Sequence, residues 1–199
     1  MIKGHRSTRA TAGALAAGLA MLGSSSAGAA TPQTRAQLRA ELLSTAELPA
    51  GWTLDSTSSS GSTSVCGVTK VLRPKVKADV AFSYAGKLPE LGEGLATVPN
   101  GSQAFARANH ALGTCSTITI HNGGETLHGR LARLQFPALA PHSAAYAATF
   151  SVQGQTLTLD LVVAAKPHSM FLLDYADIGP TNTATLQHYA TQALAKVQG

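Results

Sequence analysis

Apolar and polar residues alternate over most of the second half of the chain, a pattern typical of β-strands with one buried face. The clearest pair is the ranges 146–152 and 157–163, joined by a turn centred on Gly154. Similar alternation predicts further strands over 78–85, 116–121, 127–136 and 170–175. Short turns at 122–124 and 167–168 suit antiparallel neighbours, so the last five strands are expected to form an antiparallel meander.

Apolar residues spaced three and four apart predict three helices. They cover 31–48, opened by Thr31-Pro32, then 104–112, and finally 183–197 with Asn182 or Thr183 as its cap. The Gly- and Pro-rich range 88–101 and the Ser-rich range 56–64 are expected to be loops. This order of elements predicts an α+β domain with a single antiparallel sheet of about five or six strands, covered by helices on one face.

The first thirty residues have the three-part pattern of a secretory signal peptide. Three basic residues precede an apolar run at 10–23, and small residues follow it. This run has 14 residues, fewer than the roughly 20 that a membrane-spanning helix needs. We therefore expect cleavage of 1–30 after Ala29 or Ala30. The mature chain, 31–199, is then a single secreted domain without a membrane span, either extracellular or associated with the cell wall.

Removing the leader changes the charge of the chain. The full sequence has 15 basic and 10 acidic residues and a formal net charge of +5. Three of the basic residues lie in the leader, which leaves 12 against 10 and a mature charge of +2. The remaining Lys and Arg form no dense run, so we expect no nucleic-acid partner. The range 21–26 has no cysteine that could carry a lipid anchor.

Cys66 and Cys115 are the only cysteines of the sequence. In an oxidising compartment two thiols favour a disulfide, and only one pairing exists. A redox-active pair is the alternative, but such cysteines usually lie within a Cys-x-x-Cys motif. We expect a structural disulfide that fastens the helix over 104–112 to the segment before the strand over 78–85.

Several features occur in an order known from one family, over about residues 35–197: Leu42-Leu43 followed by Leu48-Pro49-Ala50-Gly51-Trp52, a helix with Phe105 that runs into Cys115, a strand over 116–120 and a closing amphipathic helix. In these features the chain resembles the exported sensor-type domain of certain mycobacterial Ser/Thr kinases and of related actinobacterial lipoproteins. The resemblance implies an antiparallel sheet with helices and a role in binding or sensing at the cell envelope. The chain departs from the family in having no kinase domain, no lipid-attachment cysteine and one cysteine pair instead of two.

No arrangement of reactive residues predicts an enzyme. The histidines at 110, 121, 128, 142, 168 and 188 are nowhere two to four positions apart, the spacing that places two metal ligands on one face. No Gly-x-Ser-x-Gly motif occurs, and the acid pairs Glu90/Glu93 and Asp174/Asp177 lie near turn residues, where solvated acids are common. We expect no metal, no cofactor and no catalysis. An uncharacterised hydrolase is the enzymatic alternative.

A binding domain remains. Trp52, Tyr84, Arg130 and Arg133 are the candidate ligand-binding residues, although ordinary packing and solvation are the alternative explanation for each. The two arginines are three apart in a strand and therefore point to opposite faces. We expect a monomeric, secreted, non-catalytic ligand-binding or sensor-like domain of the cell envelope, whose partner is an unknown small molecule or envelope protein. The alternative is a protein-interaction or structural component with an exposed apolar patch and no cleft.

Overall fold

The computed structural model describes residues 33–56, 65–122 and 125–198. The helices are α1 (Arg35–Ala40), α2 (Val68–Leu72), α3 (Gly101–Gly113) and α4 (Thr183–Lys196), with 3₁₀ turns η1 (Thr45–Glu47) and η2 (Val65–Gly67). The strands are β1 (Trp52–Ser56), β2 (Lys77–Tyr84), β3 (Lys87–Thr97), β4 (Thr117–Asn122), β5 (Glu125–Arg133), β6 (Ser143–Val152), β7 (Gln155–Lys166) and β8 (Ser169–Ile178). The Ser-rich range expected to be a loop lies outside the described residues from position 57 to 64.

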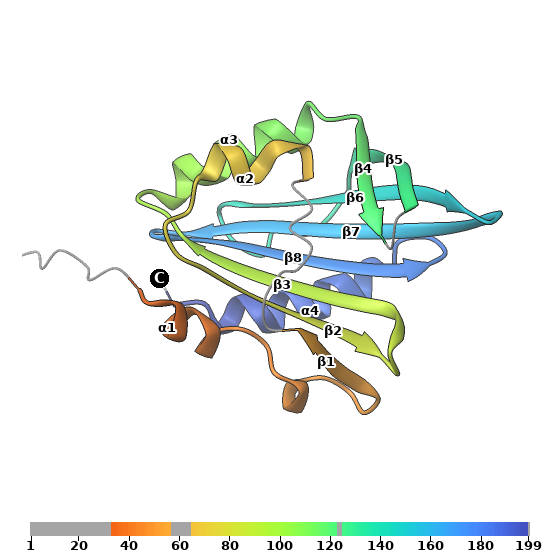
Figure 1. The fold of residues 1–199 in the computed structure, drawn as a ribbon. Coiled ribbons are helices and arrows are strands. Elements are labelled where there is room, and N and C mark those ends of the chain that lie inside the picture. Colours follow the sequence, from red (N-terminus) through yellow and green to blue (C-terminus); the bar gives the residue numbers. More distant parts are fainter. Residues whose placement is uncertain (1–32, 57–64, 123–124, 199) are drawn as a thin grey trace, which may run out of the picture. The chain divides into compact units, whose positions relative to one another are not determined.

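All eight strands belong to one sheet in the order β1-β2-β3-β8-β7-β6-β5-β4, and every neighbouring pair is antiparallel (Figure 1). The expectation of an antiparallel sheet is confirmed. The expected number of about five or six strands is wrong, because the sequence pattern did not reveal β1 and β3. β1 forms one edge of the sheet, and β3 pairs with β2 on one side and with β8 on the other.

β3 occupies most of the range that was expected to be a loop. Pro89 follows a cis peptide bond and lies opposite a register shift in β2, so its missing N–H interrupts no regular ladder. Gly92 packs against β8, where a Cβ would lie 2.5 Å from an Asp174 carboxylate oxygen. The glycine therefore provides room for a neighbouring side chain. Pairing with β2 on one side and β8 on the other outweighs the low strand propensity of these residues.

Helices cover both faces of the sheet, not one as the sequence pattern suggested. α4 packs in one cluster with Val162 and Ala164 of β7. α3 packs in other clusters with Leu161, Val163 and Ala165 of the same strand. Successive residues of a strand point to opposite faces, so α3 and α4 lie on opposite sides, as Figure 1 also shows.

The two long helices, α3 and α4, begin after N-cap asparagines. Asn100 and Asn182 accept hydrogen bonds from backbone N–H groups in the first turns of α3 and α4. α1 is much shorter than the predicted helix over 31–48, and its cap is Thr34 in place of the expected opening at position 31. It ends at Ala40 because the next residues make tertiary contacts: the backbone N–H of Leu43 donates to Glu93 of β3.

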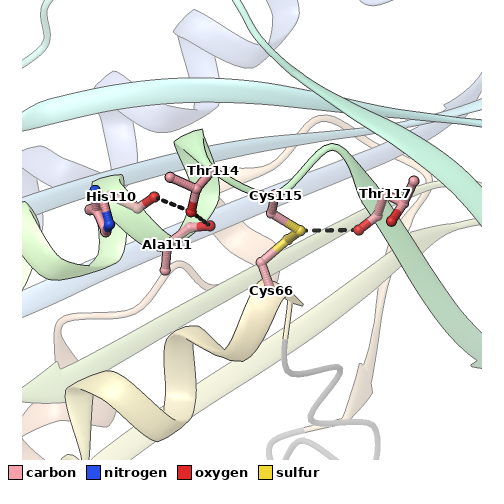
Figure 2. The surroundings of a disulfide bond; sticks show 6 residues. All are labelled: Cys66, His110, Ala111, Thr114, Cys115 and Thr117. Carbon is pink, nitrogen blue, oxygen red and sulfur yellow. Dashed lines mark hydrogen bonds between the residues drawn. A yellow bond between two sulfur atoms is a disulfide. The ribbon is translucent and has the colours of Figure 1, made fainter.

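The expected disulfide is present and joins Cys66 of η2 to Cys115, just beyond the end of α3 (Figure 2). The Cα atoms are 5.9 Å apart. Beside it, the Thr114 hydroxyl donates to the carbonyl of His110 and closes the end of α3. The Sγ atom of Cys115 lies 3.0 Å from the carbonyl oxygen of Thr117, a close contact without a hydrogen because a disulfide sulfur carries none. The bridge thus fixes the C-terminal end of α3 to the segment that enters α2.

Replacing both cysteines by serine is expected to lower the free energy of unfolding by up to about 4 kcal/mol, because the bridge closes a long loop in the unfolded chain. Urea denaturation of the oxidised chain and of the double variant measures the difference. A reducing agent should lower the stability of the natural chain to the level of the variant and leave the variant unchanged. A natural chain that is equally stable with and without reductant would contradict this role.

The first turn of α3 lies directly against the turn between β7 and β8. The N–H of Gly101 donates to the Pro167 carbonyl at 2.8 Å, and the N–H of Val98 donates to the His168 carbonyl at 2.8 Å. A Cβ at position 101 would lie 1.7 Å from the carbonyl oxygen of Lys166. The nearest atoms, the carbonyl oxygen and carbon of Lys166, belong to the backbone and cannot rotate away as a side chain could. Only glycine therefore fits at position 101.

We expect Gly101→Ala to reduce the free energy of unfolding by about 2 kcal/mol or more, as for other overpacked sites. Gly113→Ala, at the other end of the same helix, is the matched control because its Cβ would lie 3.8 Å from the Tyr146 hydroxyl oxygen, an ordinary contact. This control should be neutral or stabilising by up to about 1 kcal/mol. Equal stabilities of the two variants in urea titrations would show that the close approach is unimportant.

Candidate functional site

A cleft of about 1000 Å³ lies beside the turn between β7 and β8. Four segments line it: the start of α3 at 99–102, the β5–β6 connection at 138–142, the β7–β8 turn at 165–168 and one side of α4 near its C-terminal end. These segments are far apart in the sequence. The cleft is therefore a product of the sheet order, which brings the ends of β3, β7 and β8 together.

Hydrogen bonds hold two walls of the cleft in place. The contacts of Gly101 and Val98 described above fix the start of α3 to the β7–β8 turn. In the β5–β6 connection, the hydroxyl of Ser143 accepts from the N–H groups of Leu139 and Ala140 at 3.1 and 3.3 Å and donates to the Ala140 carbonyl at 2.9 Å. These bonds organise the walls without a ligand.

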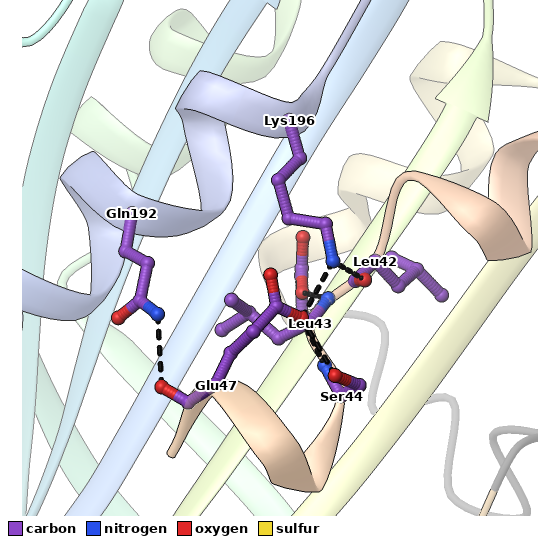
Figure 3. A network of polar contacts seen from close by, with 7 residues as sticks. Leu42, Leu43, Ser44, Glu47, Gln192 and Lys196 are labelled. Atoms are coloured by element: carbon purple, nitrogen blue, oxygen red, sulfur yellow. Dashed lines mark hydrogen bonds and ion pairs between the residues drawn. The ribbon is translucent and has the colours of Figure 1, made fainter.

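A polar network holds α4, the third wall, against the N-terminal segment (Figure 3). The Gln192 amide donates to the Glu47 carbonyl at 2.8 Å, and the Lys196 ammonium forms an ion pair of 2.7 Å with the Glu47 carboxylate. The same ammonium donates to the Leu42 carbonyl. The pKa of Glu47 is lowered, chiefly by its hydrogen bond with Lys196. α4 is therefore fixed at the turns that border the cleft.

Glu93 lies beneath this network and is only 2% exposed. One carboxylate oxygen accepts from the Leu43 N–H at 2.7 Å, while the other has no hydrogen-bond partner among the described residues. Burial raises the pKa of Glu93 to about 7; the Leu43 bond and the Lys196 charge oppose that rise, and the Glu47 charge adds to it. A carboxylate with one unbonded oxygen is costly in this position, so protonation of Glu93 favours the folded state.

The cleft itself combines an apolar lining with a few polar groups. Leu139 and Leu194 contribute apolar surface together with several prolines and alanines. The His142 ring lies 5.9 Å from the ring of Phe105, and the Nδ1 of His168 is 3.3 Å from the Pro99 carbonyl oxygen. Lys166 also lines the cleft. Such a surface suits binding of a small molecule by burial of apolar atoms, with polar groups for orientation.

The structure separates the four predicted ligand-binding residues into two groups. Trp52 and Tyr84 lie together, with ring centroids 6.1 Å apart, and Trp52 also contacts Tyr189 of α4 at 5.8 Å. Arg130 and Arg133 lie on β5, with five strands between β5 and β1 in the sheet. At about 4.8 Å per strand this places them more than about 20 Å from the aromatic pair. None of the four lines the cleft, and their role in binding stays a prediction.

The acid pairs of the sequence are also separated by the fold. Glu90 and Glu93 are three apart on β3 and therefore lie on opposite faces. The charge of Glu90 instead affects Asp174 of β8. The pKa of Asp174 is raised to about 6, chiefly by burial and also by the charge of Glu90. Burial, and then the charge of Asp55, raises the pKa of Glu90. This group of carboxylates is not part of the cleft.

Sequence reasoning missed the residues of the cleft. His142 and His168 were considered only as metal ligands, and position 99 fell in a range expected to be a loop. A weak signal exists, because three lining segments each place a proline beside a polar residue, at 99–100, 141–142 and 166–168. Nothing in their spacing indicates that they meet.

Among the residues that the structure describes, no group of three or more His, Cys, Asp or Glu side chains could hold a metal ion. No helix within 33–56, 65–122 or 125–198 is long and apolar enough to cross a membrane.

Comparison with known proteins identifies the fold. No protein-family model matches the chain, and no curated protein matches it. The chain is similar in structure to the extracellular domain of PknH from Mycobacterium tuberculosis, with a TM-score of 0.64, 13% identity, and coverage of 83% of this chain and 97% of that one. The Rv0999 ortholog of Mycobacterium smegmatis, an uncharacterised protein, matches with a TM-score of 0.45 and 10% identity over 81% of this chain and 94% of that one. The chain therefore shares its fold with the extracellular domain of a protein from the family that it resembles, as the resemblance implied.

We expect the stability of the natural chain to fall as the pH rises, because the folded-state pKa of Glu93 lies above its ordinary value of 4.5 at about 7. The free-energy cost of ionising the buried Glu93 is absent below its ordinary pKa and complete above its folded-state pKa. Glu93→Gln removes this charge. Its free energy of unfolding, relative to the natural chain, should therefore rise by about 2 kcal/mol between pH 5 and pH 8. Urea titrations at both pH values test this, and a difference independent of pH would contradict it.

Proposed function

We propose that the chain is a secreted, non-catalytic, sensor-like domain of the cell envelope that binds a small molecule in the cleft beside the β7–β8 turn. The observation that carries the proposal is the cleft of about 1000 Å³, whose walls are already held by hydrogen bonds. This volume is at the upper end of the range usual for small-molecule sites. In this proposal residues 1–30 are a leader that is removed, and 31–199 form the mature domain.

Two observations support an extracellular place of action. The disulfide between Cys66 and Cys115 is the kind of bond that persists in oxidising compartments. The fold is shared with a domain that is itself extracellular, the PknH domain. A likeness of 13% identity concerns the fold, so the binding function rests on the cleft of this chain.

The distribution of exposed apolar residues favours ligand binding over a role as an interaction or structural component. The large hydrophobic side chains that are exposed among the described residues are Leu54, Val71, Tyr84, Leu172 and Ile178. Leu54 and Tyr84 lie close together on the paired strands β1 and β2, and the other three lie on α2 and β8. A docking surface for a protein would gather such residues in one patch. The alternative of a hydrolase would need a serine, a histidine and an acid within hydrogen-bond reach of each other.

Filling the cleft tests the proposal. Ala195 lines the cleft from an exposed position of α4, so Ala195→Trp should block the space without disturbing the core. Ala184→Trp, exposed on the same helix but outside the lining, is the matched control. Nile red, a neutral dye that fluoresces in apolar sites, is the probe for the mature, oxidised chain.

We expect the natural chain and Ala184→Trp to bind the dye with the same affinity, and Ala195→Trp to bind it at least about tenfold more weakly, since the apolar walls are then filled. Fluorescence titration measures each dissociation constant, and circular dichroism confirms that the variants fold. Equal binding by all three proteins, or no binding by the natural chain, would overturn the proposal.

A further inference from the structure

We infer that the cleft recognises a ligand with an apolar body and one anionic head, a carboxylate or a phosphate, and that Lys166 is the residue that pairs with the head. This inference rests on the proposed function, since it names the class of ligand for the same cleft. Three features of the described residues support it: the state of Lys166, the charges around the cleft and the shape of the apolar lining.

Lys166 is the last residue of β7 and is partly buried at the cleft. Its ammonium group makes neither an ion pair nor a hydrogen bond with any residue that the structure describes. The lysine on α4 differs in this respect, because Lys196 is also partly buried but pairs with Glu47. A partly buried lysine without an ionic or hydrogen-bonding partner among the described residues is available to an anionic group of a ligand.

The charges around the cleft reinforce this preference. No acidic side chain is among the described residues that line it, so nothing there neutralises Lys166 or repels an anion. His142 and His168 also line the cleft, and their rings can donate hydrogen bonds to an anion. The exposed Glu90, the partly buried Asp174 and the buried Glu93 are not among the lining residues.

The rest of the lining suits an apolar body. Leu139 and Leu194 face the same cleft from the β5–β6 connection and from α4, together with Ala195. Each methylene group that such a surface buries strengthens binding roughly fourfold. The polar and apolar residues line one cleft, so a single molecule with both parts suits it better than a simple ion or a hydrocarbon.

Competition against Nile red tests the inference with three probes of ten carbons each that differ in the head: decanoate, decyl phosphate and decanol. The protein is the mature, disulfide-bonded chain. Lys166→Ala removes the charge, Lys166→Arg keeps it, and Lys87→Ala is the matched control. Lys87 is exposed at the start of β3, the end opposite to Thr97, which pairs with β8 beside the cleft.

We expect decanoate, decyl phosphate or both to displace the dye from the natural chain at a concentration about tenfold lower than decanol does, as for a charge-assisted contact. Lys166→Ala should remove this advantage without changing the affinity for decanol. Lys166→Arg and Lys87→Ala should retain it. A stronger effect of decyl phosphate indicates a phospholipid-type head, and a stronger effect of decanoate indicates a fatty-acid-type head; either result supports the inference.

The inference is overturned if decanol competes as well as the two anions, or if Lys166→Ala binds the anions as tightly as the natural chain. Its failure is distinct from failure of the proposed function. If Ala195→Trp no longer binds the dye but the three probes compete equally well for the natural chain, the cleft binds ligands and only the anionic class of ligand is wrong. If Ala195→Trp still binds the dye normally, the cleft is not the binding site and both proposals fall.

Discussion

Burial of the central hairpin on both of its faces is the constraint on which the rest of the structure depends. Every residue from Leu161 to Ala165 of β7 is buried, and β8 adds Met170 on one face and Phe171 on the other. A strand that is apolar on both sides needs cover on both sides, and α3 and α4 provide it. The two helices pass the β7–β8 turn on opposite faces, and the cleft lies in the space around that turn.

The scaffold around the cleft is held by contacts of different kinds, some beside the lining and one, the disulfide, remote from it. The disulfide fixes one end of α3, while the glycine contact fixes its other end. α4 is fixed through Gln192 and Lys196 to the N-terminal segment. Rigid walls of this kind lower the entropic cost of binding, because little has to be ordered when a ligand enters. In the proposed function, specificity depends on a few polar side chains of the lining, chiefly Lys166.

Local patterns predicted most of the strands and the two long helices, since alternation and three-to-four spacing are properties of neighbouring residues. β3 escaped prediction because Pro89 and its glycines oppose a strand, which forms only between β2 and β8. The first helix was predicted too long because tertiary contacts of Leu43 end it. The helices on both faces had a visible signal in the unbroken apolar run at 161–165, which the alternation of larger residues obscured.

The sequence by itself determined the antiparallel meander from β4 to β8, the cap of α4 and the pairing of Cys66 with Cys115, because two cysteines allow one bridge and the other features are local. Only the tertiary structure decided which residues share a site. It placed Trp52 and Arg130 near opposite edges of the sheet and gathered Lys166, His142 and Leu194 around one turn. The physical reason is that strand order brings distant segments together through long-range pairing, which local periodicity does not encode.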